Sequence, residues 1–372
     1  MNTRLQVEHP VTECVFGLDL VAQQVAVAEG RALDGAPPQS RGHAIEVRLY
    51  AEDPARDWQA QSGPVHRFEV PGVDVAFAAP SSYGLRLDSG VESGSEVSPH
   101  YDAMLAKVVA WAPNRDAAAR RLAGALAASR IHGVRTNRDL LVGVLRDPDF
   151  LGGRATTAYL SPERTRNFGA SPHRERWMRV GALAAAVCDA ERRRTRFAPA
   201  AWRNVSSQPQ QKTYLVGGDE VVARYRDQRD RLVPCDLDGV EIVEVTTVSA
   251  TMRVDGVEQR FDVATYDDGV VAVDSAQGHV DLRRQPRFVD PQEQVDAGSL
   301  LAPMPCSVVS VAVSEGERVE AGRPIVVLEA MKMQHTIRAH GPGTVTALSV
   351  QVGQQVDAGA VLAVITPEGE ER

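Results

Sequence analysis

The chain has 372 residues, of which 43% are hydrophobic and 24% are charged, and its formal net charge is −8. These values are ordinary for a globular protein of two or three domains, and the negative charge gives no reason to expect nucleic acid as a partner. No apolar run approaches the roughly 20 residues that span a bilayer, and the first ten residues lack a signal-peptide pattern, so we expect no membrane contact and a cytoplasmic location.

The first stretch, "MNTRLQVEHPVTE", alternates polar and apolar residues. In a strand, Asn2, Arg4, Gln6 and Glu8 would share one face. Such a face suits a small oxyanion, because an arginine can bind it through two parallel hydrogen bonds, a glutamine can donate another and a glutamate can accept a proton. An exposed edge strand would show the same alternation.

Further elements follow in the first 160 residues. The runs "HAIEVRLYAED" and "AMLAKVVAW" predict strands, and "NRDAAARRLAGALAASR" predicts a helix that Asn114 caps. The segment "RWMRVGALAAAVCDAERRR" predicts a second helix, within 175–192. Seven short alternating runs between 206 and 290, separated by DG and GG turns, predict an antiparallel barrel or meander.

The last 70 residues contain an internal repeat. "CSVVSVAVSEGERVEAGRPIVVL" and "GTVTALSVQVGQQVDAGAVLAVI" align at an offset of 37, with turn glycines and core valines in matching places. Two similar halves that each lack a complete core predict a flattened antiparallel sandwich. Residues 329–336 join the halves as a hairpin opposite the termini.

Lysine is rare in this chain, which has three lysines against 38 arginines. Lys332 nevertheless lies in the joining hairpin, within "EAMKMQH". A primary amine can form an amide, whereas a guanidinium serves as well wherever only positive charge is needed. We therefore expect Lys332 to be an exposed attachment point, with Met331 and Met333 as adaptable apolar surface for the modifying enzyme.

Cysteine and histidine residues give no sign of a metal site. The four cysteines form no CxxC pair, and the nine histidines show no spacing typical of metal ligands. We expect reduced cysteines and no structural zinc.

The segment "LLAPMP…EAMKMQH" resembles the biotinyl carrier domain of biotin-dependent carboxylases. The resemblance implies covalent biotin on Lys332, between Met331 and Met333, attached by biotin protein ligase. A lipoyl domain shares the fold, but its lysine usually follows aspartate. Cys306 stands where the family usually has glycine.

The opening stretch resembles the active-site strand of biotin carboxylases, which have the ATP-grasp fold. This resemblance implies that Arg4, Gln6 and the backbone of Val7 hold bicarbonate and that Glu8 is the base. It also implies that Asn2 helps to bind the Mg²⁺ or Mn²⁺ ion on ATP.

A second stretch, "LRLDSGVESGSEVSPHYDAMLAK", resembles the same family and places Arg86 against the ureido oxygen of biotin. A fixed guanidinium would stabilise the charge that develops on that oxygen. Tyr101, Asp102 and Lys107 are expected to be structural.

The whole chain is therefore expected to be multidomain α+β, similar to the C-terminal portion of an acyl-CoA carboxylase α subunit. The resemblance implies carboxylation of biotin with ATP and bicarbonate, then transfer to propionyl-, acetyl- or 3-methylcrotonyl-CoA on a carboxyltransferase β subunit in a hetero-oligomer. Most of the ATP-binding region is missing, so we expect inactivity in isolation. A non-catalytic carrier fragment and a lipoyl-type carrier are the alternatives.

The expected units are 1–160 (biotin carboxylase C-terminal region), 161–290 (linker helix and β-rich docking domain), 291–299 (linker) and 300–367 (biotinyl carrier domain).

Overall fold

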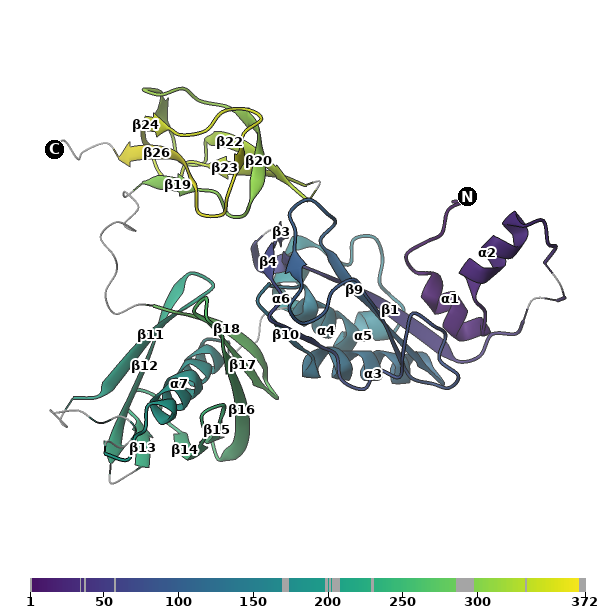
Figure 1. Ribbon diagram of the computed structural model, residues 1–372, viewed down its shortest axis with the longest axis horizontal. Coiled ribbons are helices and arrows are strands. Elements are labelled where there is room, and N and C mark those ends of the chain that lie inside the picture. The colour runs from purple at the N-terminus through teal and green to yellow at the C-terminus, as the bar shows by residue number, and fades with distance from the viewer. Residues whose placement is uncertain are drawn as a thin grey trace.

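The computed structural model consists of three units that follow one another along the chain (Figure 1). We call them the N-terminal unit (α1 to α6 with β1 to β10), the middle unit (α7 with β11 to β18) and the C-terminal unit (β19 to β26). The structure describes residues 2–33, 35–36, 38–56, 58–168, 174–197, 200, 202, 208–228, 231–285, 298–331 and 333–367. The predicted linker 291–299 falls mostly outside this part of the chain, and the predicted unit boundaries remain predictions.

The N-terminal unit is built on a four-stranded sheet of order β1-β9-β7-β6, accompanied by three two-stranded sheets. Its helices are α1 (His9–Phe16), α2 (Leu20–Ala28), η1 (Pro54–Arg56), α3 (Arg115–Ala128), α4 (Arg138–Arg146), α5 (Pro148–Leu151) and α6 (Pro162–Phe168). Its strands are β1 (His43–Tyr50), β2 (Glu52–Asp53), β3 (Gln59–Ala60), β4 (Gly63–Pro64), β5 (Arg67–Glu69), β6 (Val75–Ala76), β7 (Leu85–Ser89), β8 (Glu96–Val97), β9 (Met104–Ala112) and β10 (Arg130–His132).

Helices cover both faces of the four-stranded sheet. On one face, apolar residues of β1, β7 and β9 pack against the alanines and leucines of α3. The predicted cap of α3 is confirmed, because Asn114 Oδ1 accepts a hydrogen bond from the Ala117 N–H at 2.9 Å. On the other face, Cys14 of α1 packs against Val109 and Trp111 of β9. Alternation along each strand thus sends one set of side chains to α3 and the other set to α1.

The predicted strand at residues 2–8 does not form. These residues are irregular up to a turn at 7–8, where α1 begins. Local contacts take the place of a strand ladder: the Arg4 N–H donates to Asn2 Oδ1 at 3.2 Å, and the His9 N–H donates to the Gln6 carbonyl at 3.3 Å. A strand needs a neighbour to pair its backbone groups, and this stretch pairs with none of the described strands.

The middle unit is an eight-stranded antiparallel sheet of order β13-β12-β11-β18-β17-β16-β15-β14 that curves around the predicted long helix (Figure 1). The helix α7 (Arg174–Arg192) buries Val180 to Cys188 almost completely against the sheet. This arrangement confirms the predicted barrel-like unit. Its strands are β11 (Gln210–Val216), β12 (Asp219–Gln228), β13 (Arg231–Pro234), β14 (Val240–Val245), β15 (Ser249–Val254), β16 (Val257–Thr265), β17 (Val270–Ser275) and β18 (Gly278–Arg284).

The C-terminal unit is the predicted sandwich of two four-stranded sheets, with orders β19-β26-β24-β21 and β23-β22-β20-β25. The repeat is visible in the pairing. Cys306 pairs with Val356, and Gly343, 37 residues after Cys306, pairs with Val319, 37 residues before Val356. The strands are β19 (Ser299–Leu301), β20 (Cys306–Val311), β21 (Arg318–Val319), β22 (Pro324–Ala330), β23 (Met333–Arg338), β24 (Gly343–Leu348), β25 (Gln355–Val356) and β26 (Val361–Pro367).

No single described helix is both long and apolar enough to cross a bilayer. Helices α1 and α2 satisfy that test only as a pair joined at a bend of 100°.

Candidate functional site

Six side chains form a grid on the face of the sheet that α1 covers. The strand register places Arg48, Lys107 and Asp88 side by side across β1, β9 and β7. The adjacent row on the same face holds Glu46, Val109 and Arg86. Five of these six side chains are charged, which is unusual for a covered sheet face. Each of the three cations, Arg48, Lys107 and Arg86, contacts an acceptor on the N-terminal segment or on α1.

Arg86 is the most deeply buried charged member of the grid, with 3% of its side chain exposed. Its Nη1 donates to Glu13 Oε2 of α1 at 2.7 Å, while Nε and Nη2 donate to the two carboxylate oxygens of Asp88, both at 2.9 Å. Burial lowers the pKa of Arg86, but the hydrogen bonds and charges of Asp88 and Glu13 outweigh that effect and hold the pKa above its usual value. All three nitrogens of this guanidinium therefore donate within the protein.

Lys107 joins the same cluster to the predicted bicarbonate-binding stretch. Its Nζ lies 3.4 Å from Asp88 Oδ2 and donates to the Val7 carbonyl oxygen at 3.3 Å. Lys107 was expected to be purely structural, yet it holds the backbone at a predicted site residue. The lysine therefore fixes the position of the turn that precedes α1.

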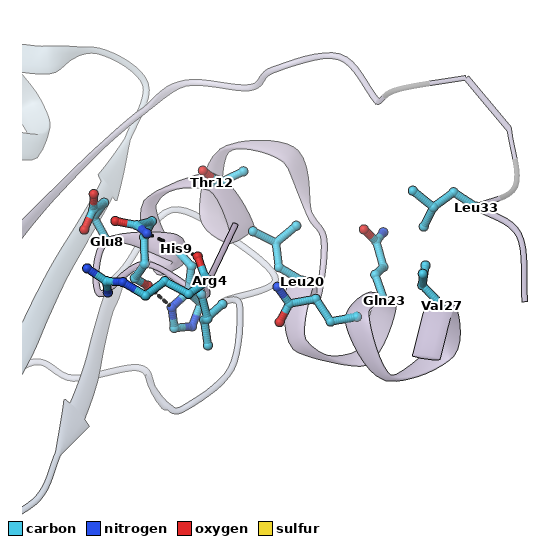
Figure 2. A pocket seen from close by; sticks show the side chains of 11 residues that line it. Arg4, Glu8, His9, Thr12, Leu20, Gln23, Val27 and Leu33 are labelled. Atoms are coloured by element: carbon cyan, nitrogen blue, oxygen red, sulfur yellow. Dashed lines mark hydrogen bonds between the residues drawn. The ribbon is translucent and has the colours of Figure 1, made fainter. Parts of the chain in front are cut away.

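Three of the predicted site residues, Arg4, Gln6 and Glu8, line one cavity of about 480 Å³. Figure 2 shows Arg4, Glu8 and His9 at one end of this cavity, and Val27 and Leu33 at the other. Glu8 Oε2 accepts a hydrogen bond from Arg48 Nη2 at 2.9 Å, and 58% of the Glu8 side chain and 40% of the Arg48 side chain are exposed. An exposed ion pair of this kind contributes little to stability, so an incoming anion can replace Glu8 as the partner of Arg48 at low cost.

The predicted ligand role of Arg86 remains a prediction. Its Nε, Nη1 and Nη2 each donate one hydrogen bond to Glu13 or Asp88, and both terminal nitrogens carry a second N–H. Arg48, which sequence reasoning missed, presents an accessible guanidinium beside Glu8. The signal was present in "HAIEVRLYAED", where Glu46 and Arg48 interrupt an otherwise apolar strand on one face.

Glu46 is the one member of the grid whose carboxylate is incompletely paired. Its Oε2 is buried and has no hydrogen-bond partner among the residues that the structure describes. Burial raises the pKa of Glu46 from its usual 4.5 to about 7, although Lys107 and Arg48 act in the opposite direction. The carboxyl group two residues from Arg48 therefore changes charge near neutral pH.

The predicted metal-binding role of Asn2 remains a prediction. Asn2 is exposed, its Oδ1 accepts from the Arg4 N–H, and it does not line the cavity. No group of three or more described carboxylates, histidines or cysteines that could hold an ion includes residues near it. We therefore assign no chemical step to a metal at Asn2, or to ATP.

The hairpin that contains the predicted attachment lysine connects β22 to β23. Ala330 pairs with Met333, so two residues make the turn, and Met331 has the positive φ of 50° that tight hairpin turns use. Lys332 itself lies outside the described residues.

Met331 is not exposed as expected. It is 6% exposed, and its N–H donates to the Pro99 carbonyl of the N-terminal unit at 3.0 Å. Met333 is half-buried. The hairpin thus packs against the N-terminal unit, and Figure 1 shows the C-terminal unit beside β3 and β4.

Three protein-family models match parts of the chain. The biotin carboxylase C-terminal domain matches residues 46–162, and a model described as biotin-requiring enzyme matches residues 296–365. The ATP-binding domain of the carbamoyl-phosphate synthase L chain matches residues 1–36.

Curated relatives align with nearly the whole chain. The propionyl-CoA carboxylase alpha chain of Ruegeria pomeroyi is 34% identical over 96% of this chain and 56% of its own length. Methylcrotonoyl-CoA carboxylase subunit alpha, mitochondrial, of Mus musculus is 30% identical over 97% of this chain and 52% of its own length. The chain therefore spans about half the length of the curated relatives that it matches.

Among solved structures, the biotin carboxylase domain of a thermophilic 2-oxoglutarate carboxylase bound to bicarbonate is 36% identical. The match covers 46% of this chain and 37% of that chain, with a TM-score of 0.41.

Replacing Glu13 by alanine should loosen α1 from the sheet. The substitution leaves part of the buried Arg86 charge without its partner, which costs about 3 kcal/mol. Hydrogen exchange of the α1 amides measures this loss as faster local opening. Glu29→Ala removes an exposed partner of Arg31. It should change the free energy of local opening, as measured by exchange, by less than about 0.5 kcal/mol. Equal effects of the two substitutions would contradict a special role for Glu13.

Replacing Glu46 by glutamine should change the pH dependence of stability. Between pH 4.5 and about 7 the folded chain keeps a proton that the unfolded chain has released, so wild-type stability falls as pH rises through this window. The glutamine variant lacks this dependence, and its unfolding free energy relative to wild type should rise by at most about 1.4 kcal/mol per pH unit. Urea unfolding below, within and above the window measures the difference, with Glu92→Gln as an exposed control. A flat difference for Glu46→Gln would show that this carboxyl titrates in the folded chain as it does in the unfolded chain.

Proposed function

We propose that this chain belongs with the α chains of biotin-dependent acyl-CoA carboxylases, that it carries biotin on Lys332 and that it supplies part of the site where that biotin is carboxylated. The observation that carries this proposal is the hairpin. A two-residue turn flanked by Ala330 and Met333 joins the halves of a duplicated sandwich. The hairpin also packs on the unit that holds the candidate site.

The carrier role follows from the support beneath the lysine. Strands β22 and β23 are paired from Pro324–Arg338 to Ala330–Met333, with one irregularity between Pro324 and Val326, so paired strands support both sides of the hairpin. Biotin bound there would supply a ureido nitrogen that accepts and releases a carboxyl group. The bond between the Met331 N–H and Pro99 is one contact through which the hairpin meets the N-terminal unit.

In the N-terminal unit, we assign the roles by exposure and geometry. Arg4 and Gln6 line the cavity and would hold bicarbonate, with the backbone at Val7 fixed by Lys107. Glu8 is the base that takes the bicarbonate proton. We propose that Arg86 faces the ureido oxygen of biotin, and that the accessible guanidinium of Arg48 also stabilises negative charge that develops there.

The partners follow from the relatives. We propose that biotin protein ligase modifies Lys332, that a carboxyltransferase β subunit receives the carboxyl group and that the assembly is a hetero-oligomer. Relatives named for propionyl-CoA and for methylcrotonoyl-CoA are similarly close to this chain, so we propose a short acyl-CoA substrate without choosing between them. The four described cysteines are all free, which supports a reducing compartment such as the cytoplasm.

Biotinylation of Lys332 is testable on the chain itself. After coexpression with biotin protein ligase, streptavidin should capture the wild type, and its intact mass should increase by one biotinyl group. Lys332→Arg should abolish both signals, because a guanidinium does not form the amide. Lys212→Arg is the matched control, since Lys212 is ion-paired with Asp189 at 2.6 Å in the middle unit, and it should stay fully biotinylated. A lipoyl mass would favour the lipoyl-type carrier, and no added mass would contradict both carrier functions.

The role of Arg48 requires an enzyme in which the ATP-binding region of the relatives is present. There, Arg48→Ala should lower biotin-dependent ATP cleavage by about 10²- to 10³-fold, with a small change in thermal stability because its ion pair is exposed. Arg31→Ala is the control, because it breaks another exposed pair far from the grid in sequence. Full turnover in Arg48→Ala would remove this arginine from the mechanism.

A further inference from the structure

The N-terminal and middle units meet through histidine and carboxylate side chains. Strands β5 and β10 of the N-terminal unit face β16, β17 and β18 of the middle unit. At the edge of this contact, His66 Nε2 lies 3.0 Å from Asp268 Oδ2, and the His66 ring stacks on Tyr266 with centroids 4.1 Å apart. At its centre lies a denser cluster.

Two imidazole rings converge there on one carboxylate. His132 Nε2 lies 2.9 Å from Asp274 Oδ2, and His279 Nδ1 lies 2.8 Å from Asp274 Oδ1. One ligand atom from each of the three residues lies within 4.8 Å of the others. The side chains of His132, His279 and Asp274 are 0%, 8% and 15% exposed. Two nitrogens and a carboxylate, shielded from water, are a donor set that transition-metal ions use.

Each histidine is also held by its other ring nitrogen. His132 Nδ1 lies 2.7 Å from the Tyr266 hydroxyl, and His279 Nε2 lies 2.7 Å from Asp281 Oδ1. Partners of this kind orient metal-binding histidines, because they fix the ring and the tautomer. The arrangement therefore has both an inner set of ligands and the outer contacts that support them.

We propose that His132, Asp274 and His279 bind one divalent transition-metal ion, with Zn²⁺ as the best match, and that the ion clamps the N-terminal unit to the middle unit. His132 Nε2, His279 Nδ1 and the Asp274 carboxylate are the protein ligands, and water completes a four-coordinate shell. An imidazole nitrogen must lose its proton before it can bind the ion, so the N–H protons that point at Asp274 are released on binding. The proposal is independent of the carrier function.

The ring geometry sets one requirement for binding. The two rings lie nearly parallel, with centroids 5.1 Å apart and planes 15° apart. A metal ion lies in the plane of each imidazole that binds it, so one ring turns before both nitrogens reach the same ion. Tyr266 and Asp281 accompany that adjustment as the outer contacts. The ion would join His132 to Asp274 and His279, which lie 142 and 147 positions later in the sequence. It would therefore restrain the two units much more than any local pair does.

The test uses the whole chain after removal of metal with EDTA. Titration calorimetry with Zn²⁺ should show one site per chain. X-ray absorption of the Zn²⁺-loaded wild type should show nitrogen and oxygen ligands with imidazole scattering. Absence of a stoichiometric site, or sulfur ligands from the free cysteines, would overturn the proposal. The absorption measurement needs no variant, so it is not affected by misfolding.

Variants then locate the site. Asp274→Asn and His279→Gln should each weaken Zn²⁺ binding at least tenfold, and Asp281→Asn, which removes an outer contact, should weaken it about 10- to 100-fold. His66→Gln is the matched control at the same contact between units and should leave affinity unchanged. Undiminished binding in His279→Gln, with circular dichroism showing a folded chain, would contradict the assignment.

Discussion

The buried ion cluster of Arg86, Asp88 and Glu13 is the constraint on which the N-terminal unit depends. Taking these charges out of water is unfavourable, and only complete pairing offsets that cost. Two oxygens of Asp88 accept from one edge of the guanidinium, and Glu13 accepts from its remaining side. Because Glu13 belongs to α1 and Asp88 to β7, the cluster can be satisfied only when α1 lies on this face of the sheet. Charge pairing therefore gives α1 a defined position that apolar packing alone would leave less specific.

That position determines what the neighbouring residues can do. Once α1 is fixed, the turn before it lies where Lys107 reaches the Val7 carbonyl and Arg48 reaches Glu8. Arg86 and Arg48 then differ in how much of each side chain is exposed. Arg86 is buried within the ion cluster, whereas Arg48 is 40% exposed and can exchange its partner for a ligand.

Local signals in the sequence were sufficient for the elements and the repeat. Asn114 caps α3 as predicted, and the offset of 37 reappears as equivalent strand pairs at Cys306 and Gly343. Features that depend on distant partners were not accessible. Residues 2–8 alternate like a strand but pair with no described strand. Arg86 and Arg48 have similar sequence surroundings, and only the packing of the fold buries Arg86 and leaves Arg48 exposed. The cluster at His132, Asp274 and His279 has no recognisable spacing because its members come from separate units.

The docking of the hairpin on the N-terminal unit illustrates what a mobile carrier requires. A single backbone hydrogen bond contributes about 0.5–1.5 kcal/mol net, and burial of one methionine adds about 1.5–3 kcal/mol. Such a contact is weak between separate molecules, because association costs several kcal/mol of translational and rotational freedom. Within one chain that cost is largely removed by the high effective concentration of a tethered domain. Met331 can therefore hold the hairpin at Pro99 through a contact of modest free energy, and a contact of this strength is reversible, as the proposed carrier function requires.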